Sequence, residues 1–404
     1  MHRLVVALAS VVALAALVAA SPALAQSLKT DEVYSSIAAR PITAPNPVLG
    51  ADGRVHLAYE LYVTNPSKLF VTLDKVEAVD GAGNALASLD GEGLGAMMTD
   101  YAGTARTLPP GGTAAVFLDV PLAREARLPD RVLARITAKR QEAGPDGKPV
   151  PMPARAPLPA TFTFTGAETG IGRPAVVIAP PLRGKGWVAI NGCCDALTSH
   201  RGAIMAINGR LRVPERFAID FVKLDAGDRL FTGDVHKLES YAFYGVPVHA
   251  VADGVVANLY DATDAQVPGG DAKGITPENI GGNMLVIDMG GGNFAFYAHM
   301  QRGSLKVKLG DTVRTGDVIG LLGNTGNTNA PHLHFHVMDG PSPLDANGLP
   351  YVFTRFEGQG VANPAGADFF EKPVPADIDR TRLAGPRQDA LPLNNQVVDF
   401  GDGK

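Results

Sequence analysis

Three of the nine histidines in this 404-residue chain occupy alternate positions, His332, His334 and His336, in the stretch APHLHFHV. Successive side chains of a β-strand point to opposite faces, so a strand here would place the three imidazoles together and the apolar residues between them in a core. Imidazole is a common metal ligand and the usual acid–base group near neutral pH. The alternative is a solvated edge-strand face, but Thr, Lys or Ser would serve there equally well. The spacing predicts a metal or acid–base site.

The composition indicates a β protein with many turns. Apolar residues make up 46% of the chain and charged residues 19%, with 46 glycines and 31 prolines. This apolar fraction supplies a sizeable core, and frequent glycine and proline favour turns. The formal net charge is −5 and no dense basic patch occurs, so we expect no nucleic-acid partner.

The first 25 residues predict a signal peptide. Arg3 precedes an apolar stretch at residues 4–20, and Ala23 and Ala25 fit the small-residue rule for cleavage. We expect cleavage before Gln26 and a periplasmic or secreted protein, with an uncleaved membrane anchor as the alternative. No later stretch is long and apolar enough to span a bilayer, so we expect no transmembrane helix in the mature chain. The oligomeric state stays open.

The only two cysteines, Cys193 and Cys194, are adjacent. Metal-binding CxxC spacing and a disulfide framework are both absent from the sequence. Neighbouring Cα atoms lie about 3.8 Å apart across a trans peptide, which is closer than a disulfide usually requires. We interpret the pair as two partly buried thiols or as a structural vicinal disulfide.

The strand and turn patterns predict an all-β chain of two domains. Residues 26–165 contain alternating stretches such as RVHLAYELYVTN and predict an immunoglobulin-like β-sandwich, whose His56 we interpret as a surface or satisfied histidine. Residues 166–182 are expected to be a linker. Residues 183–358 contain short, glycine-punctuated strands that suggest a β-sandwich barrel. Residues 359–404, rich in Asp, Asn, Gly and Pro, are expected to be a poorly ordered tail.

Further stretches of the second domain accompany the histidine strand in a recognisable order. RFAIDFV carries Asp220, GVPVHAVADGVV follows it, FYAHM carries His299, and VKLGDTVRTGDVIGLLGNTG leads into the histidine strand. Together with GNTGNTNAPHLHFHV, they resemble the LytM/lysostaphin-like zinc metalloendopeptidases over about residues 201–337. The resemblance implies the duplicated hybrid motif fold of that family.

The resemblance also implies roles for individual residues. Asp220 and His334 match ligands of Zn²⁺, and His299 and His332 match the two active-site histidines that are not ligands. His336 lies beyond that core and receives no chemistry. Two imidazoles and one carboxylate around zinc leave a coordination position for water, which the two non-ligand histidines would assist in attacking a peptide bond.

The third ligand must come from another position than in most relatives. The family's usual first ligand is a histidine four residues before the aspartate, where this chain has Arg216, and arginine has no lone pair to offer. We predict that His200 is the third ligand, and divergent relatives resemble this chain in carrying such a Ser-His-Arg segment. His236 and His249 are the alternatives.

A hairpin would bring His200 to the aspartate. The segments AIMAI and RFAIDFV are predicted strands joined through the turn at Asn208–Gly209. With a one-residue bulge, His200 would lie opposite Ala218, on the same face as Asp220. The two side chains would then lean toward one ion.

The leading hypothesis is therefore an exported zinc metalloendopeptidase that cleaves peptide cross-links of peptidoglycan. A cell-wall peptide is the expected partner, with a protein substrate as the alternative. A catalytically degenerate relative that binds a cell-wall peptide or regulates a partner hydrolase is the second hypothesis, because Arg216 is a departure of the kind such members show. A biotinyl or lipoyl carrier is the third, but its exposed lysine at a hairpin tip is absent from the sequence.

The sequence of the amino-terminal sandwich contains no cluster of polar residues typical of a catalytic site. We expect the sandwich to position or occlude the cleft. On that basis a chain that begins near Pro174 is expected to keep its zinc.

Overall fold

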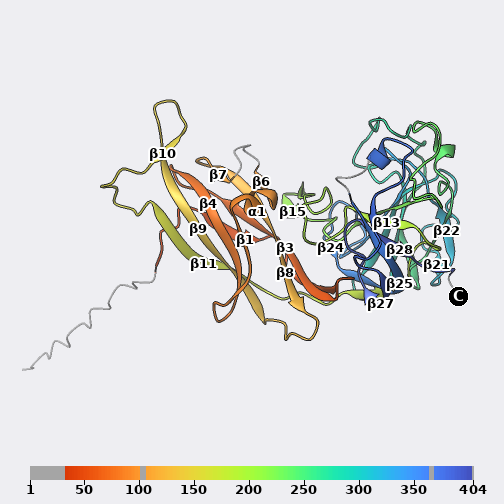
Figure 1. Ribbon diagram of the computed structural model, residues 1–404, viewed down its shortest axis with the longest axis horizontal. Coiled ribbons are helices and arrows are strands. Elements are labelled where there is room, and N and C mark those ends of the chain that lie inside the picture. Colours follow the sequence, from red (N-terminus) through yellow and green to blue (C-terminus); the bar gives the residue numbers. More distant parts are fainter. Residues whose placement is uncertain (1–31, 101–105, 364–367, 403–404) are drawn as a thin grey trace, which may run out of the picture. The chain divides into compact units, whose positions relative to one another are not determined.

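The computed structural model describes residues 32–100, 106–363 and 368–402, which are built mainly from strands (Figure 1). The predicted all-β class is confirmed, because among these residues only one short α-helix, α1 (Gly91–Ala96), occurs beside the 3-10 turns η1 (Leu238–Ser240) and η2 (Asp368–Phe370). The predicted signal peptide, residues 1–25, lies outside the described residues. Within the described ranges, no helix has the length and apolar character needed to cross a membrane.

The amino-terminal part is a sandwich of two antiparallel sheets. The first sheet consists of β1 (Ala38–Pro41), β2 (Asn46–Leu49), β3 (Arg54–Thr64), β6 (Met98–Asp100) and β8 (Thr113–Ala123). The second consists of β4 (Phe70–Asp80), β5 (Ala85–Asp90), β7 (Thr107–Leu108), β9 (Arg131–Ala143), β10 (Pro149–Pro151) and β11 (Thr161–Gly170). Both sheets contribute to one apolar core. Its immunoglobulin-like character stays a prediction.

Strand β3 shows how the alternating pattern builds this core. Leu57 and Leu61 point into the core between the two sheets, as a period of two requires. The opposite face of β3 is also buried, and it carries Ala58, which packs in the core of the second part of the chain, and the charged residue Glu60. The described residues from 35 onward accordingly form one compact unit.

His56 on β3 is a buried histidine with partners for both ring nitrogens. Its Nδ1 lies 2.8 Å from Asp119 Oδ2 and its Nε2 lies 3.2 Å from Asp52 Oδ1. Burial alone would lower the pKa of His56, but the two carboxylates outweigh burial and raise it to about 9. The interpretation of His56 as a satisfied histidine is confirmed.

Stability should therefore fall with rising pH through the His56 titration. Because the folded pKa is about 9 and the ordinary value is 6.5, the stabilisation is complete below pH 6.5 and lost as the pH rises through 9. We expect the free energy of unfolding to fall by up to about 3 kcal/mol more in the wild type than in His56→Gln between these limits. Guanidinium denaturation at a series of pH values measures both proteins. Parallel pH profiles would contradict the assignment.

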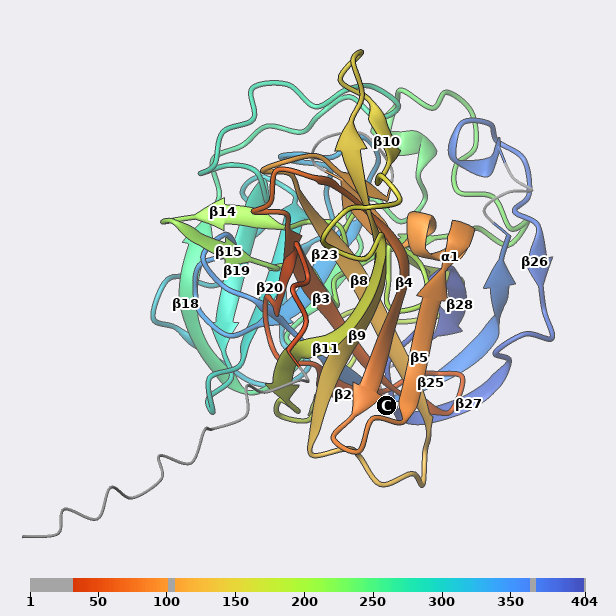
Figure 2. The ribbon, with the colours of Figure 1, turned by 90° about the vertical axis from the view of Figure 1, so that its left-hand side faces the viewer.

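The second part is organised around one large, mostly antiparallel sheet of 13 strands among the described residues. Its continuous path consists of β12 (Val176–Ile178), β25 (Tyr351–Ala362), β28 (Gln396–Asp399), β13 (Trp187–Ile190), β16 (Ile219–Lys223), β23 (Leu333–Met338), β20 (Phe294–Met300), β19 (Asn283–Asp288), β18 (Gly254–Tyr260) and β21 (Thr312–Val313). Strands β18, β19 and β20 lie side by side in Figure 2. The histidine strand β23 lies between β16 and β20, so its position inside the sheet orders its side chains.

Seven further strands complete the described residues of this part. They are β14 (Met205–Ile207), β15 (Arg210–Arg212), β17 (Pro247–His249), β22 (Val318–Leu321), β24 (Gly348–Leu349), β26 (Ile378–Asp379) and β27 (Gly385–Ala390). The strand predicted from HLHFHV is confirmed, with Leu333, Phe335 and Val337 fully buried in the core behind the histidines.

The expectation of a poorly ordered tail at residues 359–404 is wrong for the part that the structure describes, residues 359–363 and 368–402. Strand β25 continues to Ala362, β27 pairs with it, and β28 pairs with both β13 and β25. Phe400 packs against Phe221 and Phe353, with ring centroids 5.6 and 5.3 Å apart. The short apolar stretch QVVDF supplies this sheet strand, and the polar composition of the whole segment concealed it.

The expected linker, residues 166–182, is also more regular than predicted. Strand β11 extends to Gly170, and β12 pairs in parallel with β25. The segment therefore contributes one strand to each part, because both of its ends find neighbouring backbone partners.

Candidate metal centre

Strand pairing places Asp220 beside His334. The two residues are direct partners in the antiparallel register of β16 and β23, and His334 Nδ1 lies 3.0 Å from Asp220 Oδ1. On the other side of β23, His334 pairs with Ala298, the neighbour of His299. His332 immediately precedes β23. Three strands far apart in the sequence thus bring four of the five predicted site residues together.

His200 reaches the same place by a route that differs from the predicted one. The predicted turn at Asn208–Gly209 joins β14 to β15, but β14 does not pair with β16. The reason is that β16 already has two neighbours, β13 and β23. His200 instead lies in a turn, with Nδ1 3.0 Å from the Ala218 carbonyl oxygen and Nε2 3.2 Å from Asp220 Oδ2.

His200, Asp220 and His334 form a compact set of donor atoms. One ligand atom from each lies within 4.8 Å of the others, and both histidines are buried. Because a carbonyl oxygen only accepts, Nδ1 of His200 carries a proton, so Nε2, which faces Asp220, is the nitrogen that could bind a metal once it has lost its own proton. A hydrogen bond of this kind fixes the tautomer that a metal ligand needs.

The two alternative histidines lie outside this set. His236 Nδ1 donates to the Pro268 carbonyl at 2.9 Å, and His249 Nδ1 donates to the Gly316 carbonyl at 2.9 Å. Among the described residues, only two groups of ligand type are close enough to hold a metal, and neither contains His236 or His249.

The second of these groups, His56, Asp119 and Cys194, is less suited to a metal. Cys194 forms a disulfide with Cys193, which is the vicinal disulfide weighed above. The peptide between them is cis, with Cα atoms 3.1 Å apart, so the trans spacing assumed from the sequence does not apply. Both ring nitrogens of His56 face carboxylates.

His299 and His332 are oriented as a second pair beside the donor set. His299 donates from Nδ1 to the Thr325 carbonyl at 2.7 Å, and His332 donates from Nδ1 to the Ala330 carbonyl at 2.8 Å. Their ring centroids lie 4.6 Å apart. Since both Nδ1 protons are held by backbone, Nε2 is the atom of each ring that can exchange a proton.

The backbone around His299 is specialised for this orientation. His299 has a φ of 62°, in the left-handed region that non-glycine residues rarely adopt. Gly282 has a φ of 61°, and a Cβ there would collide with the Thr325 carbonyl that accepts from His299. Strained conformations of this kind are common at functional sites.

Burial and charge shift the pKa values of the cluster in opposite directions. Burial lowers the pKa of His299 well below its ordinary value, and His332 and His334 add to the effect. For His200 and His332, burial also lowers the pKa, but Asp220 outweighs it, raising that of His200 to about 9. Burial raises the pKa of Asp220, but His200 and His332 outweigh it and hold it well below the usual range. The carboxylate is therefore ionised, and metal binding must release protons.

Arg216, at the usual ligand position, contacts a different part of the chain. It is 1% exposed, its Nε donates to Glu60 Oε1 at 2.8 Å, and its remaining guanidinium nitrogens contact Glu60 Oε2, Thr43 and the Ala44 carbonyl. Arg201, next to His200, donates to the Leu118 carbonyl of β8 at 3.1 Å. Both arginines therefore tie segments of the site to the amino-terminal sandwich.

Two contacts of the site were not assigned a role from the sequence. Asn191, which follows β13, donates from Nδ2 to Asp220 Oδ2 at 2.9 Å. His336, to which no chemistry was assigned, lies 2.9 Å from His334 through its Nδ1. The first contact depends on the pairing of two strands that are distant in the sequence, whereas the second joins neighbours on one face of β23.

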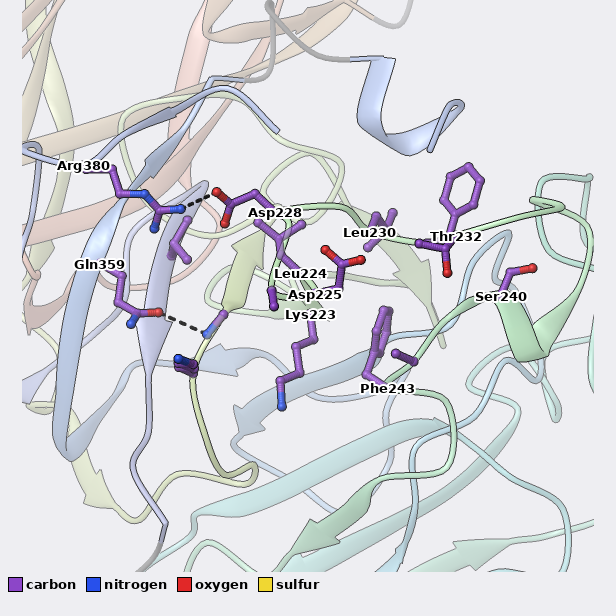
Figure 3. Close-up of a pocket in the computed structure, with 16 residues that line it drawn as sticks. Lys223, Leu224, Asp225, Asp228, Leu230, Thr232, Ser240, Phe243, Gln359 and Arg380 are labelled. Atoms are coloured by element: carbon purple, nitrogen blue, oxygen red, sulfur yellow. Dashed lines mark hydrogen bonds and ion pairs between the residues drawn. The ribbon is translucent and has the colours of Figure 1, made fainter. Parts of the chain in front are cut away.

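The five predicted site residues line a cleft of about 440 Å³ that also contains Glu215 and Asp271. A separate pocket of about 490 Å³ lies near the other end of β16 and contains Lys223, Asp225, Phe243 and Arg380 (Figure 3). None of the predicted site residues lines this second pocket, and its Arg380 is paired with Asp228. The cleft is therefore the candidate site.

A cleft with a buried His-Asp-His donor set and two further imidazoles has the features of a metal-dependent hydrolase. Residues 236–346 match the sequence profile of peptidase family M23, so the chain contains a domain of this family. The matched region includes His299, His332 and His334, whereas His200 and Asp220 precede it.

Similar proteins include two curated endopeptidases. Glycyl-glycine endopeptidase ALE-1 of Staphylococcus capitis is 28% identical over 128 residues, which are 32% of this chain and 31% of the relative. Peptidoglycan DD-endopeptidase ShyA of Vibrio cholerae serotype O1 is 32% identical over 102 residues, which are 25% of this chain and 20% of the relative. The chain thus spans less than a third of either relative. The resemblance to lysostaphin-like peptidases is confirmed.

One similar solved structure is the catalytic domain of lysostaphin from Staphylococcus simulans. It is 23% identical, covers 41% of this chain and 86% of that chain, and has a TM-score of 0.22. That TM-score is low, so the fold described above rests on the strand pairing of this chain itself.

Proposed function

We propose that this protein is an exported zinc metalloendopeptidase that cleaves peptide bonds in peptidoglycan cross-links. The observation that carries the proposal is the convergence of His200, Asp220 and His334 beside two more histidines in one cleft. The peptidoglycan endopeptidase named among the relatives supports the substrate. The signal peptide predicted from residues 1–25 supports export.

The donor set fits zinc. Two imidazole nitrogens and one carboxylate oxygen are typical of catalytic zinc sites, which keep a further position for water. When bound, zinc would lower the pKa of that water to about 7 and polarise the peptide carbonyl. His200 and His334 would supply the nitrogen ligands, and Asp220 the oxygen ligand.

His299 and His332 would carry the proton transfers. Because burial lowers the pKa of His299, its ring is neutral and its Nε2 is suited to accept a proton from the attacking water. His332 is suited to donate a hydrogen bond from Nε2 to the developing oxyanion, because this atom lies at the donor set, 3.3 Å from Asp220 Oδ1, and against the effect of burial Asp220 raises the pKa of the ring. The backbone carbonyls that hold both Nδ1 protons keep these atoms aimed at the cleft.

Metal removal and one substitution test the proposal together. Incubated with sacculi, the purified protein should release cleaved muropeptides, lose this activity with a chelator and regain it with added zinc. His332→Ala should keep stoichiometric zinc but lose activity by about 10²–10⁴-fold, because it removes a proton-transfer group and no ligand. Muropeptide chromatography and metal analysis measure the two effects.

The same experiment defines the outcomes that would refute the proposal. No metal-dependent release from any cross-link type would remove the peptidoglycan claim. Metal-dependent cleavage of a protein substrate alone would leave a peptidase with a different substrate. Equal activity of His332→Ala and wild type would remove His332 from the mechanism.

A protein that binds cell-wall peptide without cleaving it is the second candidate. Arg216 favours it, because the residue at the usual ligand position is engaged with Glu60. Metal analysis separates the two candidates, since a binder of this type should purify without stoichiometric zinc.

A further inference from the structure

His336 is a buried polar residue to which the proposed chemistry gives no role. It lies on the same face of β23 as His334 and is 1% exposed. Its Nδ1 lies 2.9 Å from His334 Nε2. Its own Nε2 is buried and has no hydrogen-bond partner among the described residues. A buried polar atom without a partner is costly, so its retention calls for an explanation.

The protons of the two rings can be assigned from the contacts of His334. Its Nδ1 faces Asp220 at 3.0 Å, on the side of the donor set. A ring nitrogen that binds a metal offers a lone pair, so His334 as a ligand carries its proton on Nε2. That N–H then needs an acceptor, and Nδ1 of His336 occupies the position. His336 consequently carries its own proton on the unpartnered Nε2.

Strand β20 contributes an apolar ring against both imidazoles, and its only histidine, His299, has its ring centroid 5.9 Å from that of His334 and its Nδ1 bound to the Thr325 carbonyl. Phe296, the direct partner of His336 on that strand, packs against both imidazoles, with ring centroids 5.8 Å from His334 and 4.9 Å from His336. Phe296 belongs to a small apolar cluster with Val286 and Met338. The apolar packing restricts both rings, so the hydrogen bond between them sets the rotation of His334.

We propose that His336 is a positioning residue that accepts the Nε2 proton of His334 and thereby directs the Nδ1 lone pair toward the metal. This inference rests on the proposed zinc site. It assigns the hydrogen bond from Nε2 of the ligand His334 to Nδ1 of His336. Metal-bound histidines usually donate to a carboxylate, a carbonyl or water. In this protein the acceptor is instead the neutral imidazole of His336. The family resemblance assigns no role to that position.

Two nearly isosteric substitutions separate the hydrogen bond from packing. In His336→Asn, the amide Oδ1 can occupy the place of Nδ1 and accept the proton, whereas His336→Leu puts a methyl group there. The zinc dissociation constant of each full-length protein is measured by competition with a chromophoric chelator. We expect His336→Leu to bind zinc about 10–100-fold more weakly than wild type, and His336→Asn to bind it nearly as tightly.

Two further measurements use the same three proteins. Thermal unfolding without metal monitors the fold, and it should respond similarly to both substitutions. The visible spectrum of the Co²⁺-loaded proteins reports on ligand geometry, and it should change in His336→Leu but not in His336→Asn. A residue that only fills space would give the same spectrum and affinity in both variants.

The outcomes separate this inference from the proposed function. Equal zinc affinity of wild type and His336→Leu, or equal loss in both variants, would overturn the positioning role alone. A wild type that binds zinc but releases no muropeptides would overturn the proposed function and leave the positioning role standing. A wild type without zinc affinity would overturn both.

Discussion

The His200→Ala protein is expected to purify without stoichiometric zinc and to lose metal-dependent peptidase activity. His200 Nε2 is one of three donor atoms, and the two that remain, on Asp220 and His334, cannot complete the set. The affinity loss should exceed the roughly 10–100-fold that removal of an outer hydrogen-bond partner costs. Metal analysis of the folded protein and activity on sacculi measure the two effects.

Two other histidines provide matched controls. His236→Ala and His249→Ala each remove a ring that donates to a backbone carbonyl outside the donor set. Both proteins should keep their zinc. If His200→Ala keeps full zinc while one of these variants loses it, the third ligand is the histidine of that variant.

The Glu60→Leu protein should be less stable than wild type by about 3–5 kcal/mol, because the substitution leaves a buried guanidinium without its carboxylate. Glu60 is fully buried and Arg216 is 1% exposed. The double variant Glu60→Leu/Arg216→Met should recover much of this loss, since neither charge then remains buried. Guanidinium denaturation at constant pH measures the free energy of unfolding of each protein.

The exposed ion pair between Arg131 and Glu168 is the control for this measurement. Their side chains are 52% and 51% exposed, so Glu168→Leu should cost less than about 1 kcal/mol. If Glu60→Leu is no more destabilising than Glu168→Leu, the buried pair does not hold the two parts of the chain together.

Features of the site that depend on residues close together in the sequence were predictable. Those that depend on the pairing of distant strands were predicted incompletely. Alternation in HLHFHV predicts a strand with His332 and His334 on one face, because the strand period is a local property. The register that pairs Asp220 with His334 depends on strands 114 residues apart, for which only the family resemblance gave guidance. The pairing predicted for His200 failed because both edges of β16 are occupied by other strands.

The two errors in the outer segments have a related cause. The composition of residues 359–404 is polar on average, and it led to the prediction of a poorly ordered tail. A few apolar side chains, including Val397 and Val398, are nevertheless enough to add a strand to the sheet. A strand inside a sheet needs only a short apolar stretch when its backbone finds partners on both sides. The carboxyl-terminal segment is therefore part of the core that supports the candidate metal centre.

The contacts of Arg216 and Arg201 also change the expectation for a chain that begins near Pro174. Such a chain would lack Glu60 and the Leu118 carbonyl, which these arginines contact. Arg216 would then lose its carboxylate and Arg201 one of its two carbonyl partners, beside the segments that carry His200 and Asp220. Weaker zinc binding is the more consistent expectation for this shortened protein.

The Arg216–Glu60 pair finally constrains how this protein can change over evolutionary time. A single substitution of Arg216 by histidine would place an imidazole at the family's usual ligand position. It would also leave the buried Glu60 carboxylate without its cationic partner. A substitution that removes the Glu60 carboxylate alone would leave the buried Arg216 guanidinium without its anionic partner. A single substitution at either residue therefore leaves a buried charge without its partner, so the pair resists change although it takes no part in the chemistry proposed for His200.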